Sequence, residues 1–129
     1  ELLEKTGKLL KDKEIIFSSK SFENVVADDK EVFYYLDPPY RPISKTSSFT
    51  DYTKSSFNDK TQFALKEYCD KIDKKGSFFM QSNSYSDDGF FQNLYKNRKI
   101  KMLKVMRTIS ADGTKRNKTK EIIIKNYES

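Results

Sequence analysis

Residues 32–40 have the sequence VFYYLDPPY, an apolar run that stops at a carboxylate, two prolines and an aromatic ring. The run has the composition of a buried strand, so these groups would stand at the carboxyl end of that strand. Open α/β sheets bind ligands at the edge where their strands have their carboxyl ends. Proline has a fixed φ and no N–H, so Asp37 and the carbonyl of Pro38 can both accept hydrogen bonds from a ligand. With Tyr40 offering a ring for stacking, the turn suits a planar aminated heterocycle such as adenine or cytosine. The alternative is an ordinary strand that ends in a proline-stiffened turn.

Helices and strands alternate around this run. Upstream, the pattern predicts an amphipathic helix over 2–12, a strand over 14–18 and a short helical turn over 21–26 with Ser21 as its N-cap. Downstream, it predicts helices over 58–76 and from Asp88, and strands over 77–80, 100–109 and 121–127. Three consecutive isoleucines, 122–124, indicate a strand covered on both faces and therefore central. The order predicts one α/β domain with a mostly parallel sheet and an antiparallel last strand.

The composition describes a small domain with a strongly charged surface. The 129 residues are 36% hydrophobic and 34% charged, and 25 Lys and Arg against 19 Asp and Glu give a net charge of +6, which favours a polyanionic partner. Cys69 is the only cysteine and histidine is absent, so we expect no disulfide, no zinc site and no histidine-based catalysis, and a cytoplasmic location. The apolar runs are too short for a membrane helix, and we expect no signal peptide because the first residues lack a basic segment.

Further motifs follow DPPY (37–40) in a characteristic order. They are Arg41-Pro42, TSSFTDY over 46–52, SFND over 56–59, Ser82-Asn83-Ser84, Arg107-Thr108-Ile109-Ser110 with Arg116, and EIIIKNY over 121–127. In this order they resemble the C-terminal half of Dam-type, alpha-class (D12) DNA adenine-N6 methyltransferases, from Ile15 to Tyr127. DPPY also occurs in some RNA methyltransferases, but the long Phe-x-x-Tyr loop and the basic closing hairpin favour the DNA group. The 46–52 loop is also similar to that of enzymes that act on GATC.

The resemblance implies a partial Rossmann-like fold and methyl transfer from S-adenosylmethionine to the N6 of an adenine flipped out of double-stranded DNA, without a metal, in a restriction–modification system. Asp37 and the Pro38 carbonyl would hold the amine in the turn that Pro39 completes. Tyr40 would stack on the base. Because the reaction is a direct displacement, positioning and electrostatics would supply most of the rate. Ser21, Phe22 and Asp37 would contact the adenosine of the cofactor.

Other residues take roles from the same resemblance, each with an alternative. Phe49 and Tyr52 would close over the flipped base, or they pin their loop onto the core. Ser82 and Asn83 would line the site, or Asn83 only satisfies a turn. The basic residues around the last loop would contact DNA phosphates, or they form a solvated face: Arg107, Lys115, Arg116, Lys118 and Lys120.

Two parts of the resembling enzymes are missing from the sequence. None of its four glycines forms the Phe-x-Gly-x-Gly element that binds the methionine end of the cofactor, and no target recognition segment precedes residues 14–18. The chain also does not begin with Met, so we expect residues 1–129 to be the C-terminal part of a catalytic domain, inactive alone. Without its neighbours in the family's sheet, the DPPY strand would form an exposed apolar edge that self-associates. The alternatives are a non-catalytic basic nucleic-acid-binding module and a methyltransferase that acts on RNA or protein.

Overall fold

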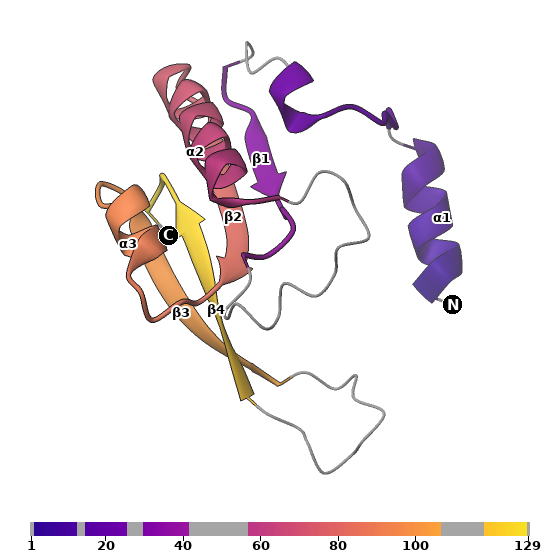
Figure 1. The fold of residues 1–129 in the computed structure, drawn as a ribbon. Helices are drawn as coiled ribbons and strands as arrows, with labels where there is room; N and C mark the ends of the chain where they lie inside the picture. The colour runs from indigo at the N-terminus through magenta and orange to yellow at the C-terminus, as the bar shows by residue number, and fades with distance from the viewer. Residues whose placement is uncertain (1, 13–14, 26–29, 42–56, 107–117, 129) are drawn as a thin grey trace.

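The computed structural model describes residues 2–12, 15–25, 30–41, 57–106 and 118–128 (Figure 1). Helix α1 (Leu2–Asp12) comes first, followed by a 3-10 turn, η1 (Phe22–Asn24), and strand β1 (Phe33–Leu36). The remaining elements are α2 (Asp59–Lys74), β2 (Phe78–Ser84), α3 (Phe90–Leu94), β3 (Lys99–Met106) and β4 (Lys118–Lys125). The fold is therefore α/β, as the alternation of patterns predicts.

The four strands form one mixed sheet in the order β1-β2-β4-β3. β1 pairs with β2 in parallel, whereas β4 runs antiparallel to both β2 and β3. The prediction of a mostly parallel sheet is wrong, because β4 inserts between two strands of equal direction and turns their contact into two antiparallel pairings. The antiparallel last strand and its central position are confirmed.

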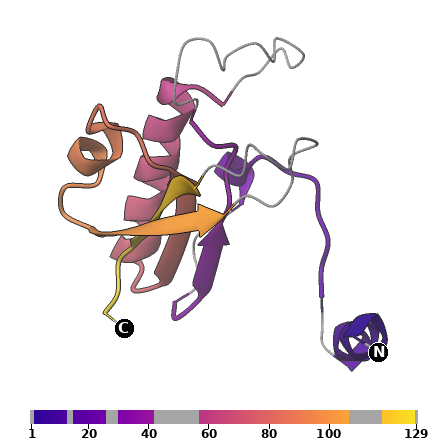
Figure 2. The ribbon, with the colours of Figure 1, turned by 90° about the horizontal axis from the view of Figure 1, so that it is seen from below.

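Helices α2 and α3 cover one face of this sheet (Figure 2). The side chains buried between helices and sheet are Leu65, Tyr68, Cys69, Ile72, Phe79, Phe91, Tyr95, Ile122 and Ile124. Ile123, between two buried isoleucines, points to the other face and is only half-buried. The expectation that all three isoleucines are covered therefore fails, since the described residues place no helix on that face.

Residues 15–18 do not form the predicted strand. They are extended, but no described strand pairs with them, and Ile16 and Phe17 are 83% and 85% exposed. A strand is stable only when a neighbour satisfies its backbone N–H and C=O groups, and the described residues supply none here. Ser21 does cap the short turn that follows, by accepting a hydrogen bond from the backbone N–H of Glu23.

The caps of the helices determine where the loops around the sheet begin. Asn58 caps α2 through its side-chain oxygen, which accepts from the backbone N–H of Thr61 at 3.1 Å, and Gly76 with φ of 76° ends that helix, as predicted. At α3 the N-cap is Gly89 with φ of 70°, while Asp88 accepts from the backbone N–H of Phe90 at 3.0 Å. The cap therefore lies one residue later than predicted.

Candidate active site

The turn after β1 begins at Asp37, beside the end of β2. The parallel register ends at the pair Leu36 and Gln81, so Asp37 comes next to Ser82, whose hydroxyl donates to its Oδ1 at 2.7 Å. Asp37 is otherwise exposed, and among the described residues its second carboxylate oxygen has no hydrogen-bond partner. One oxygen therefore fixes the carboxylate, and the other is available to accept from a ligand.

The turn ends at Arg41, which is held by the same strand. The backbone N–H of Arg41 donates to Oδ1 of Asn83 at 3.1 Å, and its carbonyl accepts from the hydroxyl of Ser84 at 2.7 Å. Five residues, 37–41, thus lie beside only three residues of β2. The surplus length lies at the two prolines, which lack N–H groups and so need no partner in the sheet.

Tyr40 is held from the neighbouring strand β4. Its hydroxyl donates to Oε2 of Glu121 at 3.3 Å, and Glu121 stands opposite Ser84 in the β2–β4 pairing. Burial raises the pKa of Tyr40 above its usual value, so the hydroxyl stays a donor at neutral pH. The carboxylate of Glu121 therefore fixes how the ring of Tyr40 stands beside the turn.

A cavity of about 380 Å³ lies beside residues 37–39 of the turn. It is lined by Lys20, Phe22, Tyr35, Leu36, Asp37, Pro38, Pro39, Phe57 and Leu65. Phe22 packs against the rings of Phe57 and Tyr68 at centroid distances of 6.1 and 5.7 Å, so the aromatic wall is fixed in place. The structure thus brings Phe22 and Asp37 together, whereas the side chain of Ser21 caps η1 and does not line the cavity.

Ser82 and Asn83 of β2 contact the first and last residues of the turn. Both are buried, and Asn83 accepts from Arg41 through Oδ1 while its Nδ2 donates to Gln62 at 3.4 Å. Asn83 therefore satisfies a backbone N–H group of the turn, as the alternative drawn from the sequence proposed. Contact of Ser82 or Asn83 with a base stays a prediction. Sequence reasoning missed Gln62 and Glu121. Gln62 could have been noticed as a polar residue on the apolar face of α2, one turn before Leu65.

Most of the predicted loop and DNA-contacting residues lie outside the described residues: Phe49, Tyr52, Arg107, Lys115 and Arg116. Lys118 is the first residue of β4, but its side chain is not described. The ammonium of Lys120, two residues along the same strand, lies 5.0 Å from the ring centre of Tyr85. Tyr85 follows the Ser82–Ser84 segment, so the side chain of Lys120 lies beside the residue that follows the polar end of β2.

The described residues contain no group of three or more side chains able to hold a metal ion. Within the same residues, no helix combines the length and the apolarity that crossing a membrane requires.

Comparison with known proteins identifies a family for the chain. The model of the family of D12 class N6 adenine-specific DNA methyltransferases matches residues 1–109. The chain belongs to this family. It is 43% identical over 126 residues to the Type II methyltransferase M.MjaIII of Methanocaldococcus jannaschii. The aligned region covers 97% of this chain and 43% of that protein.

Two further relatives extend this similarity to bacteria. The chain is 38% identical over 128 residues to the Type II methyltransferase M1.LlaDCHI of Lactococcus lactis subsp. cremoris, covering 98% of this chain and 44% of that protein. It is 35% identical over 97 residues to the DNA adenine methylase of Escherichia coli K12, covering 75% of this chain and 34% of that protein. The chain thus spans less than half the length of the curated relatives it matches.

Proposed function

We propose that residues 1–129 carry the catalytic turn of a DNA adenine-N6 methyltransferase that uses S-adenosylmethionine. The observation that carries the proposal is the Asp37 carboxylate, fixed by Ser82 through one oxygen and open at the other, at the mouth of an aromatic-walled cavity. An exocyclic amine can donate to the open oxygen, and the carbonyl of Pro38 offers a second acceptor beside it.

The cavity supports the assignment of S-adenosylmethionine as methyl donor. Its volume of about 380 Å³ lies within the usual range for small-molecule pockets. The rings of Phe22, Pro38 and Pro39 offer it apolar surfaces that suit the planar adenine ring of an adenosine. Phe22 and Asp37 would hold the adenosine part. The residues for the methionine end would come from a glycine-rich element outside residues 1–129.

The bound cofactor supplies an electrophilic methyl group. Asp37 and the Pro38 carbonyl accept hydrogen bonds from the two N–H groups of the adenine amine and so direct its lone pair out of the plane of the ring. The ring of Tyr40 stacks on the flipped base. S-adenosylmethionine would supply the methyl group with its sulfur as the leaving group, and the adenine amine would release one proton to water. The contribution of the turn is orientation and electrostatics.

The substrate would be double-stranded DNA, and the setting a restriction–modification system, since two relatives are named Type II methyltransferases. We further propose that residues 1–129 form the C-terminal part of the catalytic domain and do not methylate DNA by themselves. The cavity is formed by the chain, but the binding of the methionine end and the selection of a DNA sequence are left to other residues.

The test is methyl transfer by the natural polypeptide that contains residues 1–129. It is incubated with tritiated S-adenosylmethionine and duplex DNA, and the labelled base is identified after hydrolysis. We expect N6-methyladenine, and we expect Asp37→Ala to lower the rate by at least about a thousandfold while non-specific DNA affinity stays within about twofold, because Asp37 faces the amine and not the phosphates.

Other outcomes would replace the proposal. Label in RNA or protein but not in DNA would keep the fold and change the substrate. No transfer to any of the three, together with loss of DNA affinity in Asp37→Ala, would make the chain a non-catalytic nucleic-acid-binding module.

A further inference from the structure

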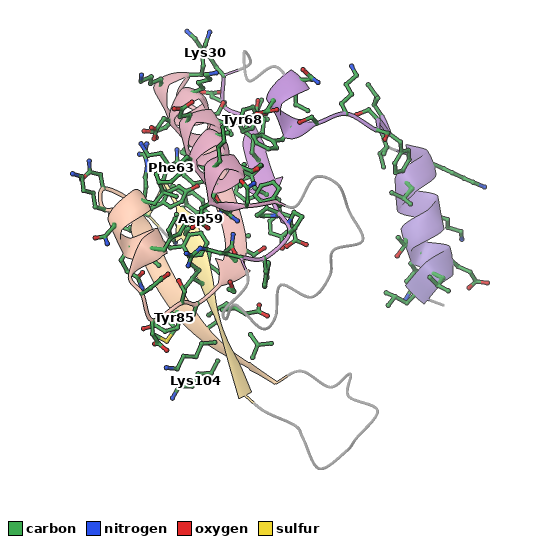
Figure 3. The ribbon with its side chains drawn as sticks, in the orientation of Figure 1. Lys30, Asp59, Phe63, Tyr68, Tyr85 and Lys104 are labelled. Atoms are coloured by element: carbon green, nitrogen blue, oxygen red, sulfur yellow. The ribbon has the colours of Figure 1, made fainter. Side chains whose placement is uncertain are left out.

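The side chain of Arg41 joins the turn to both helices that cover the sheet. Its Nε and Nη2 donate to the two oxygens of Asp59 at 2.6 and 3.0 Å, and its Nη1 donates to Asp88 at 2.6 Å. Asp59 is the first residue of α2 (Figure 3), and Asp88 lies just before α3. The guanidinium also lies 4.1 Å from the ring centre of Phe90. Four contacts with three partners thus hold one side chain.

The charges of this cluster match its geometry. The hydrogen bond to Asp59 raises the pKa of Arg41 above its usual value, and the hydrogen bond from Arg41 lowers the pKa of Asp88 to about 2. Arg41 and Asp88 are therefore ionised over the whole physiological range. The two-pronged contact with Asp59 also fixes the plane of the guanidinium, which a single ammonium group could not do.

The backbone of the turn offers few N–H groups to hold its shape. Pro38 and Pro39 have no N–H to donate, and the upstream end is tied to β2 through the side chains of Asp37 and Ser82. At the downstream end, the backbone of Arg41 is bound to Asn83 and Ser84, and its side chain is bound to the helices. Arg41 therefore fixes the end of the turn relative to the sheet and to both helices.

We propose that Arg41 is a positioning residue that, through Asp59 and Asp88, sets the orientation of Asp37 and Tyr40 for methyl transfer. The inference rests on the proposed function. Its physical basis is that a catalytic group displaced by about 1 Å lowers a reaction rate by about a hundredfold. Arg41 touches neither substrate nor cofactor in this account; it acts through the backbone of the turn.

The chain supplies a matched control in Arg98. Its Nη1 and Nη2 donate to Asp73 and Asp70 at 2.7 and 3.1 Å, and its guanidinium also lies over a ring, that of Phe79, at 5.9 Å. The two arginine side chains are 18% and 19% exposed. Each arginine therefore binds two carboxylates at nearly the same exposure. Arg98 binds two aspartates in the last turns of α2, whereas Arg41 binds the first residue of α2 and Asp88, just before α3.

The experiment compares Arg41→Lys, Arg41→Ala and Arg98→Lys in the natural polypeptide that contains residues 1–129. Single-turnover methylation of duplex DNA is measured at saturating S-adenosylmethionine, and the melting temperature and the KM for DNA are measured in parallel. We expect the single-turnover rate to fall about tenfold in Arg41→Lys and about a hundredfold in Arg41→Ala, with KM within about twofold. Arg98→Lys should lower the melting temperature as much as Arg41→Lys does and leave the rate unchanged.

Each result decides between a positioning and a purely structural role. Equal rates in Arg41→Lys and Arg98→Lys, at a temperature where both are folded, would overturn the inference and leave the proposed function intact. Absence of DNA methylation by the unaltered protein would instead overturn the proposed function. If Arg41→Lys does not fold, Asp88→Asn is compared with Asp73→Asn. A rate about threefold lower in Asp88→Asn supports the positioning role, and equal rates overturn it.

Discussion

At the scale of single residues, the turn is held mostly by side chains that are distant in sequence. Ser82 binds Asp37, Asn83 and Ser84 bind the backbone of Arg41, and Glu121 binds the hydroxyl of Tyr40. These partners are 42 to 81 residues away along the chain. The polar end of β2 thus binds the turn of its neighbouring strand, which explains why Ser82, Asn83 and Ser84 are buried there.

Glu121 can be tested through the hydrogen bond that it accepts from Tyr40. We expect Glu121→Ala to lower the single-turnover rate of DNA methylation about fivefold, since a hydrogen bond of this kind contributes about 1 kcal/mol. Tyr40→Phe keeps the ring and removes the same hydrogen bond, so it should give a similar fall. The double variant should then be no slower than either single variant. A fully additive double variant would mean that Glu121 acts on the rate through another group.

At the scale of elements, α2 links the core to the site. Its apolar face packs on the sheet through Leu65, Cys69 and Ile72, and its first residue, Asp59, binds Arg41. An acidic residue in the first turn also interacts favourably with the positive end of the helix dipole. The exact start of α2 therefore matters for the turn as well as for stability.

That start depends on Asn58, whose side chain caps α2. We expect Asn58→Ala to lower the free energy of unfolding by about 1 kcal/mol, because the N-cap hydrogen bonds to Thr61 are lost. Asn97→Ala serves as control, as Asn97 is an exposed residue in a turn after α3. Thermal unfolding of the two variants measures the difference. Equal stability of both would show that the cap contributes nothing.

At the scale of the whole molecule, helices cover only one side of the sheet. Phe33, Tyr35 and Phe78 stand on the other side and are exposed, and β1 is an edge strand that pairs only with β2 among the described strands. An apolar edge strand is a template for pairing with another chain. The sequence-based prediction of self-association through this edge remains untested and becomes a measurable property of residues 1–129.

We expect the isolated chain of residues 1–129 to self-associate, and Phe33→Lys to reduce that association because it places a charge on the edge strand. Light scattering after size-exclusion chromatography measures the mass at several concentrations. Phe63→Lys on α2 is the control, since the two phenylalanines are 53% and 52% exposed but lie on opposite sides of the sheet. Equal effects of both substitutions would mean that general hydrophobicity, and not the edge, drives association.

Local signals in the sequence were enough to predict most of the helices and strands. The apolar periodicity of residues 59–74, the cap at Asn58 and the glycine at 76 predicted α2 to within two residues, because these signals act within one or two helical turns. The run Phe33–Leu36 likewise predicted β1. The motif order was enough for the family. The strand over 14–18 failed because its stability depends on a neighbour, which the local pattern does not report.

By itself, the sequence determined the helices, the four strands of the sheet, the DPPY turn at a strand end and the family, although it also predicted a strand over 14–18 that does not form. Only the tertiary structure decided that β4 lies between β2 and β3, and hence that the sheet is mixed and that Glu121 reaches Tyr40. It also decided that Arg41 binds Asp59 and Asp88. The physical reason is that propensity, capping and periodicity are properties of neighbouring residues, whereas these contacts depend on strand order and on how each helix packs on the sheet.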